Sequence, residues 1–192
     1  MQPHNFTTKS QEAMQRASEI AREFEYPHIE PPHLFAALLT DNDGVVLSVL
    51  NRLEAPVETI KNATHDLMRS LPRFEGQMPP GGLGQVLVSN LTHALLQEAG
   101  KQAGTMGDEY ISVEHIFLAF LSHKNPVADL LSGYSVTHKT TLQALAAVRG
   151  TQKVDSPEPE TKYQALEKYG KNFTDLARQE KLDPVIGRDT EV

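Results

Sequence analysis

The sequence predicts an all-α fold, and three observations carry that prediction. From Thr8 onward, apolar residues recur at steps of three and four, which is the spacing of one helix face. No segment of any length alternates between apolar and polar residues with a period of two, so strands are not predicted. The chain also matches itself at a separation of 82 residues, which indicates an internal repeat. We therefore expect a duplicated four-helix repeat of about eight helices.

Helix starts can be placed from local chemistry. Thr7 or Thr8 can cap the first helix, and Thr8 with Gln11 has the spacing of a capping box. A second helix is expected to open at Glu30 and the two prolines after it, because proline is tolerated in a first turn where the amide has no partner. A short third helix is expected over residues 45–53, and a fourth begins at residue 56.

The internal repeat is the strongest single signal in the sequence. Identical residues stand 82 positions apart at the following pairs: Gln15 and Gln97, Ala17 and Ala99, Ala21 and Ala103, Ile29 and Ile111, His33 and His115, Phe35 and Phe117, Ala37 and Ala119, Leu39 and Leu121. A slip of one residue then keeps Leu50 against Leu131. Residues 86–149 should therefore rebuild the four helices of residues 6–71. The two units are expected to share one core, because each alone is small for a stable core.

Composition excludes several classes of protein. The chain has 18 basic and 25 acidic side chains, a net charge of -7, which argues against non-specific nucleic-acid binding. The absence of cysteine excludes disulfide scaffolds, thiol nucleophiles and cysteine-ligated zinc, and fits a reducing compartment. No apolar run approaches the ~18 residues of a membrane-spanning helix, and no signal peptide is visible. We expect a globular, cytoplasmic protein that binds neither nucleic acid nor membranes.

No catalytic or metal-binding motif emerges from the histidines and serines. His33 and His115 each stand at the fourth position of a helix, without a second histidine four residues away, so we expect them to order the helix start or to pack partly buried there. Ser112 lacks a nucleophile elbow and is interpreted as an N-cap, with Glu114 favoured by the helix dipole. The glycines at 81–84 lack the Gly-Lys-Ser/Thr of a phosphate loop and are interpreted as a connector.

Two features leave room for a binding role. Asp108, Glu109 and Tyr110 occupy a turn between helices, where the carboxylates can bind a basic or backbone-donor partner or can simply be solvated. A bundle built from two repeats can also leave an apolar groove that takes extended or helical peptides.

The C-terminal part of the chain introduces a family resemblance. Residues 165–189, which end in Leu-Asp-Pro-Val-Ile-Gly-Arg-Asp, resemble the entry into the first ATPase domain of the Clp/Hsp100 unfoldases. The N-terminal domain of these proteins is itself a duplicated four-helix repeat. Residues 6–7, 11–13, 29–34 and 107–115 are similar to its pattern. Residues 71–72 with the glycine-rich loop after them, and residues 164–169, favour the ClpB-type disaggregases.

The resemblance implies a domain plan and a set of partners. Residues 1–149 would form the N-terminal domain, 150–159 a flexible linker and 160–192 the helical start of an AAA+ nucleotide-binding domain. ClpB-type proteins are hexameric rings that use ATP and Mg²⁺ to thread aggregated polypeptide, with a DnaK-type chaperone as partner. By match, Val185, Ile186, Gly187 and Arg188 would form an incomplete half of a nucleotide pocket. The Walker A and B motifs would lie beyond residue 192, so we expect this chain alone to be a monomer without cofactor, metal or enzymatic activity.

The resemblance also implies substrate-binding residues: Thr7, Asp108, Tyr110 and Glu114. Glu98, Gln102 and His115 stand where relatives carry apolar side chains, which is a departure from the family pattern. The expected function is recognition of unfolded or aggregated polypeptide for an ATP-dependent disaggregase. The alternative is an adaptor-docking domain of a protease-linked unfoldase of the ClpA or ClpC type, and an enzyme in its own right has no supporting constellation.

Overall fold

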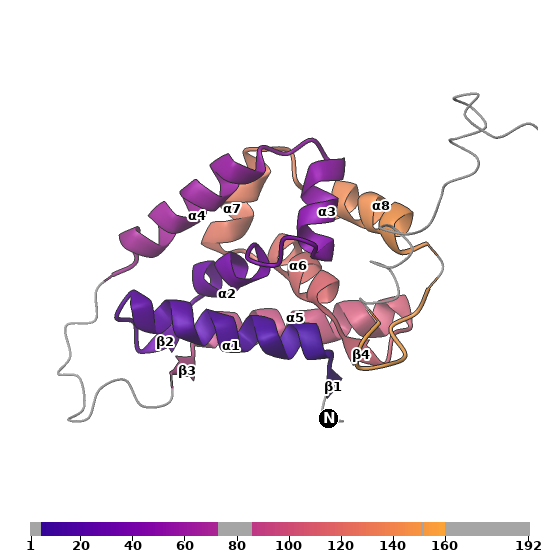
Figure 1. The fold of residues 1–192 in the computed structure, drawn as a ribbon, viewed down its shortest axis with the longest axis horizontal. Helices are drawn as coiled ribbons and strands as arrows, with labels where there is room; N and C mark the ends of the chain where they lie inside the picture. The colour runs from indigo at the N-terminus through magenta and orange to yellow at the C-terminus, as the bar shows by residue number, and fades with distance from the viewer. Residues whose placement is uncertain (1–4, 73–85, 151, 160–192) are drawn as a thin grey trace, which may run out of the picture.

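The computed structural model describes residues 5–72, 86–150 and 152–159, and within them it confirms the all-α fold (Figure 1). The described residues form eight helices: α1 Thr8–Glu23, α2 Pro31–Leu38, α3 Val45–Arg52, α4 Val57–Ser70, α5 Asn90–Met106, α6 Val113–Ser122, α7 Pro126–Ser132 and α8 His138–Arg149. None of these helices is both long and apolar enough to cross a membrane. The expected start of an AAA+ domain at 160–192 lies outside the described residues, as does the connector at 81–84.

The helices of the second half begin where the repeat predicts. The starts of α5 and α6 lie 82 residues after those of α1 and α2, and the starts of α7 and α8 lie 81 residues after those of α3 and α4. The one-residue slip therefore falls between the second and third helices of the repeat. The duplication inferred from sequence is confirmed as a duplication of structure.

Four strands of two residues each were not predicted: β1 Asn5–Phe6, β2 His28–Ile29, β3 Leu87–Val88 and β4 Tyr110–Ile111. They are too short to produce an alternating pattern in the sequence. β1 pairs in parallel with β4, and β2 pairs in parallel with β3, so each pair joins one repeat to the other. The pairing aligns Asn5 with Tyr110 and His28 with Leu87. The start of each repeat is thus fixed against the strand that precedes the second helix of its counterpart.

Equivalent side chains cap the helices in both repeats. Thr7 and Ser89 are the N-caps of α1 and α5, and their hydroxyl oxygens accept the backbone N–H groups three residues on, at 3.3 and 3.2 Å. The N-cap is therefore Thr7 and the capping box expected from Thr8 and Gln11 is not formed, because the Gln11 side chain donates to the carbonyl of Phe6 at 3.0 Å. These bonds satisfy amides that have no partner inside a helix.

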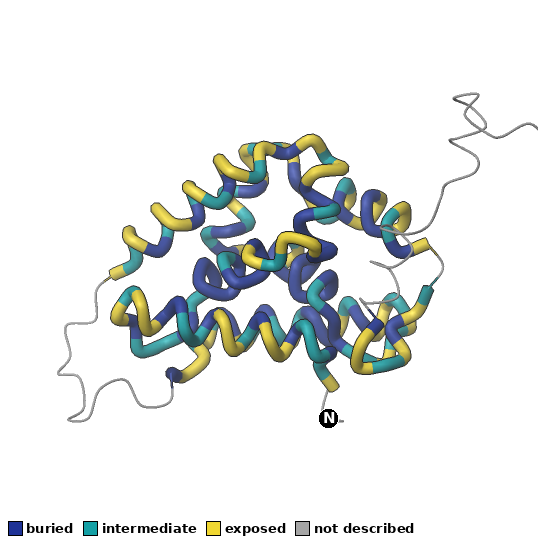
Figure 2. The backbone as a smooth tube through the Cα atoms, viewed as in Figure 1, coloured by how far each residue is buried: buried dark blue, intermediate teal, exposed yellow. Residues whose placement is uncertain are grey.

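The core lies between the repeats. α2 and α6 run through the centre of the molecule and are almost entirely buried, whereas α1 and α4 present one exposed face (Figure 2). The rings of Phe35 and Phe117, which occupy equivalent positions, stack with centroids 6.2 Å apart, and Phe120 meets Phe35 edge-on at 5.6 Å. α3 packs on α8 and α4 on α7, so the outer helices also pair across repeats. Neither repeat buries its own apolar surface alone.

This shared core makes a specific prediction about stability. Phe117→Ala should lower the free energy of unfolding by about 3–5 kcal/mol, because it removes a fully buried ring that both repeats contact. Leu142→Ala on α8, where the side chain is 41% exposed, should cost less than about 1 kcal/mol. Urea unfolding followed by circular dichroism measures both, and equal losses would contradict a core centred on the paired phenylalanines.

Candidate functional site

A buried cluster of charged groups lies beside the β1–β4 pair. Asp108 comes from the turn before β4 and its side chain is fully buried. Its Oδ1 atom accepts two hydrogen bonds, one from the guanidinium of Arg149 on α8 and one from the Val154 N–H at 2.9 Å. The other oxygen lies 3.0 Å from Nε2 of His115. Burial alone would raise the pKa of Asp108, but the bonds from Arg149 and Val154 hold it below its usual value.

His115 is oriented by the start of its own helix. Its Nδ1 lies 3.0 Å from the backbone nitrogen of Ser112, the N-cap of α6. Since an amide nitrogen can only donate, Nδ1 accepts, and the neutral ring carries its proton on Nε2, where it donates to Asp108. Burial lowers the pKa of His115 and outweighs the opposing effect of Glu114 and Asp108, which favours this neutral form.

Glu114 and Arg149 complete the cluster. Both are almost completely buried, and Nη1 of Arg149 lies 4.0 Å from a carboxylate oxygen of Glu114. The guanidinium therefore stands between two carboxylates, Asp108 and Glu114. Buried charges of this kind are tolerated only when they are paired, so the three side chains depend on one another.

The first repeat shows that the fold does not need this charge. His33 stands 82 residues before His115, and its Nδ1 likewise accepts the N–H of the N-cap residue Glu30 at 3.0 Å. Around it, Tyr26, Pro32 and Met68 occupy the positions of Asp108, Glu114 and Arg149. Burial lowers the pKa of His33 to about 4, against an opposing contact with the backbone of His28. The capping histidine is therefore common to both repeats, whereas the charged cluster belongs to the second.

The four residues expected to bind substrate come together around β1 and β4. The Thr7 N–H donates to the carbonyl of Ile111 at 3.0 Å, and Tyr110 pairs with Asn5. Thr7 and Glu114 are buried, whereas Asp108 and Tyr110 are half-buried as whole residues, although the side chain of Asp108 is fully covered. Their contacts are made within the chain itself, and their contact with a bound polypeptide stays a prediction.

Arg149 was missed by sequence reasoning. It is the last residue of α8, where a basic side chain ordinarily interacts with the helix dipole, and nothing local distinguishes it.

Two of the residues that depart from the family pattern, Glu98 and Gln102, lie on α5 and are hydrogen-bonded to each other at 3.1 Å. Gln102 is also hydrogen-bonded to Ser122 at 3.3 Å and to His138 at 3.2 Å. That part of α5 carries a polar network.

The nucleotide half-pocket stays a prediction, because its expected residues lie outside the described part of the chain: Val185, Ile186, Gly187 and Arg188.

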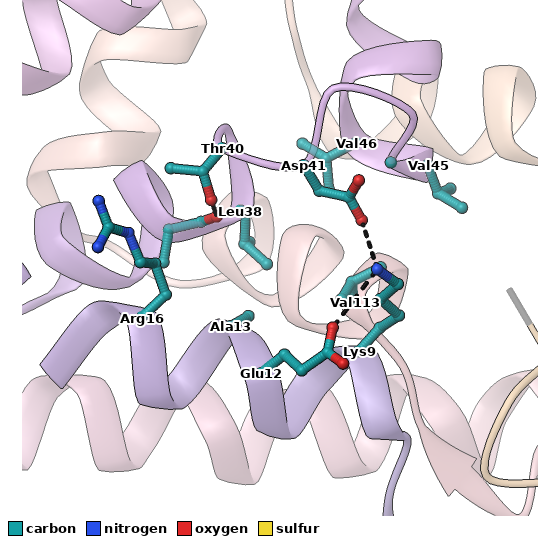
Figure 3. A pocket seen from close by; sticks show the side chains of 12 residues that line it. Lys9, Glu12, Ala13, Arg16, Leu38, Thr40, Asp41, Val45, Val46 and Val113 are labelled. Atoms are coloured by element: carbon teal, nitrogen blue, oxygen red, sulfur yellow. Dashed lines mark hydrogen bonds and ion pairs between the residues drawn. The ribbon is translucent and has the colours of Figure 1, made fainter. Parts of the chain in front are cut away.

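A second candidate site is a groove open to solvent, with a volume of about 320 Å³ (Figure 3). We call it the α1–α3 groove. It lies between α1, the end of α2, the start of α3 and the first residue of α6. Its apolar lining consists of Ala13, Ala37, Leu38, Val45, Val46 and Val113.

Charged side chains border the α1–α3 groove. Lys9 reaches across its mouth to Asp41, at 3.3 Å, and also pairs with Glu12 at 3.4 Å (Figure 3). Burial would lower the pKa of Lys9, but the two carboxylates, Asp41 above all, raise it, so the side chain is a full cation at neutral pH. Arg16 adds a second cation to the border. An apolar floor with charged side chains along its border suits a peptide segment that carries apolar and charged residues.

Within the described ranges, no group of histidine and acidic side chains is arranged to hold a metal ion.

Comparison with known proteins identifies the domain. The family model of the Clp repeat N-terminal domain matches residues 5–134. The chain belongs to the Clp N-terminal domain family. The chaperone protein ClpB of Bacillus cereus is 36% identical over the whole chain, and that of Mycobacterium tuberculosis is 38% identical. The chain spans about a fifth of the length of these relatives, 22% in both cases.

Solved structures agree with the Clp N-domain fold. The N-terminal domain of Hsp104 from Candida albicans superposes with a TM-score of 0.69 at 20% identity, covering 82% of this chain and 99% of that one. The ClpV N-domain in complex with a VipB peptide gives a TM-score of 0.57 at 20% identity, covering 74% and 85%. At this level of identity the likeness establishes the fold.

The buried histidine of the first repeat makes stability depend on pH. His33 binds a proton more readily in the unfolded chain than in the folded one, so stability is fully present above pH 6.5 and is lost as the pH falls from 6.5 towards about 4. His33→Gln keeps an acceptor for the cap but does not titrate. Between pH 7 and 4 this variant should lose about 3 kcal/mol less than the natural chain. Urea unfolding at several pH values measures the difference, and parallel curves would contradict it.

The charged cluster predicts coupled substitutions. Arg149→Met should cost about 3–5 kcal/mol, because it leaves the carboxylates of Asp108 and Glu114 buried without their cation. Asp108→Asn in the same chain should then cost much less than it does alone, so a double-mutant cycle should give a coupling above about 1 kcal/mol. Additive losses would mean that the two side chains do not act as a pair.

Proposed function

We propose that this chain is the polypeptide-recognition domain of a ClpB-type chaperone and that it binds unfolded or aggregated protein in the α1–α3 groove. The observation that carries the proposal is an open hollow of about 320 Å³ at the surface of the domain, whose apolar floor is formed by largely buried side chains of α1, α2 and α3 and by Val113. An unfolded chain offers short apolar stretches between charged residues, which match this lining and its ionic border.

The known proteins support the proposal by analogy. One structural neighbour, the ClpV N-domain, was solved with a peptide bound, so the fold is able to hold a peptide. The relatives over the full length of this chain are ClpB chaperones. Affinity for a single segment should be weak, because a hexamer presents several domains and gains avidity from them. Hexamer formation, ATP and Mg²⁺ use and cooperation with a DnaK-type chaperone belong to the same proposal for the longer protein.

A substitution that fills the groove tests the proposal. Ala13→Trp on α1 should weaken binding of a permanently unfolded model protein by about tenfold or more, because the indole occupies the apolar floor. Gln15→Trp places the same side chain on the exposed face of α1 and should leave binding unchanged. Fluorescence anisotropy with the labelled model protein measures both affinities, and circular dichroism checks that each variant is folded.

Two outcomes would contradict binding in the α1–α3 groove. If the natural chain fails to bind the unfolded protein at high micromolar concentration, or if the two tryptophan variants behave alike, the α1–α3 groove is not the binding site.

Adaptor docking is the second candidate function, and one observation favours it. Leu87 and Val88 of β3 are 60% and 37% exposed, and they border a shallow surface with His28 and Glu30. A small exposed apolar pair of this kind suits a folded partner better than an unfolded chain. Leu87→Ser should therefore leave binding of unfolded protein intact if the main proposal holds, and a loss of that binding would move the site to β3.

A further inference from the structure

The segment that follows α8 is bound to the domain along its main chain. We call residues 152–157 the strap. Arg149 donates through Nε to the carbonyl of Gln152, and the carboxylate of Asp108 accepts the Val154 N–H at 2.9 Å. The Val154 carbonyl accepts two N–H groups, from Glu109 at 3.0 Å and Tyr110 at 3.3 Å. The flexible linker expected at 150–159 is therefore held in place over these residues.

The far end of the strap reaches the other repeat. The carbonyl of Pro157 accepts the N–H of Thr8 at 2.8 Å, and Thr8 is the first residue of α1. That amide belongs to the helix start and has no partner within the helix. The strap thus crosses from the end of α8 past β4 to the first turn of α1, beside the β1–β4 pair (Figure 1).

One aliphatic side chain anchors the strap. Val154 is fully buried, yet it is not part of the main hydrophobic core that the two repeats share. Its neighbours Lys153 and Asp155 are exposed. The strap is thus held through its backbone and through the buried side chain of Val154. A site of this type accepts many sequences, because main-chain hydrogen bonds supply affinity regardless of the side chains.

In the second repeat the charged cluster also holds the strap. The first repeat has an apolar set of side chains at the same positions, and its helices form without buried charge. In the second repeat Asp108 is held by Arg149 and His115 so that its carboxylate meets a backbone N–H. An oriented carboxylate beside exposed backbone donors is a way to grip an extended chain.

We propose that the cleft under the strap is a second binding site for extended polypeptide, and that the strap occupies it as an internal competitor. The occupant is an unfolded segment with a small aliphatic residue at the position of Val154 and a free carbonyl three residues later. This inference extends the proposed function to a second site, distinct from the α1–α3 groove, and it gives Asp108 and Tyr110 a direct part in binding once the strap is released.

Releasing the strap tests the inference. Val154→Asp in the full chain should open the cleft without touching the main core, and Lys153→Ala, at the exposed neighbouring position, is the matched control. The probe is a fluorescein-labelled peptide with the sequence of residues 150–159. It should bind Val154→Asp about tenfold or more tightly than it binds the natural chain or the control, because the competitor is no longer closed over the site.

Two further measurements distinguish binding in the cleft under the strap from binding in the α1–α3 groove. Adding Ala13→Trp to Val154→Asp should leave peptide binding unchanged, and a peptide with aspartate in place of valine should not bind. Equal binding to the natural chain and to Val154→Asp, or binding to neither while circular dichroism shows both folded, would overturn the inference. The groove is judged separately, by whether the natural chain binds an unfolded model protein, so either proposal can fail while the other stands.

Discussion

The hydrogen bond from the backbone N–H of Ser112 to Nδ1 of His115 fixes the orientation and the tautomer of the imidazole, and the charged cluster depends on both. Because Nδ1 must accept, the imidazole proton sits on Nε2 and points at Asp108. Asp108 is thereby fixed between His115 and Arg149 and can offer its remaining lone pairs to the Val154 N–H. In a protonated imidazole, Nδ1 would carry a proton that faces the backbone N–H of Ser112, so the two donors would repel each other. Burial of the ring, which lowers the pKa of His115, therefore protects both the helix start and the cluster.

Duplication supplied the same cap twice, and the two copies then diverged. His33 repeats the bond to the N-cap but is surrounded by the rings of Tyr26 and Phe24, with centroids 5.2 and 6.4 Å away. The cross-repeat strand pairs and the shared core hold the two copies together. Around the capping histidine, the first repeat thus keeps apolar side chains, whereas the second keeps a charged cluster that holds a segment of backbone.

The sequence predicts most of the fold because the fold is local and repeated. Helix spacing, the capping residues at Thr7 and Ser112, and the identity of His33 with His115 all leave marks within a few residues or at one fixed separation. The strands could not be predicted, since two residues are too few to alternate. The gathering of the expected site residues at β1–β4 follows from that unpredicted pairing.

The binding surfaces were harder to predict than the fold, for a physical reason. The α1–α3 groove joins Lys9, Asp41 and Val113, which come from three elements far apart in the chain, and no motif links them. Arg149 and Val154 resemble an ordinary helix end and an ordinary linker residue until the tertiary contacts are known. Sequence patterns record periodicity and caps, whereas a surface is defined by which distant elements happen to meet.

The α1–α3 groove and the cleft under the strap differ in what fills them. The α1–α3 groove is open and available, whereas the cleft beneath the strap is filled by the chain's own residues. Both border the first turn of α1, the groove through Lys9 and the cleft through Thr8.

The most direct test of the central claim, that this domain binds unfolded polypeptide in the α1–α3 groove, is a two-dimensional NMR titration of the isotope-labelled natural chain with an unfolded model protein. If unfolded polypeptide binds there, amide shifts should change first at Ala13, Val45 and Val46, which line the groove. Shifts that change elsewhere while these three stay fixed would contradict it.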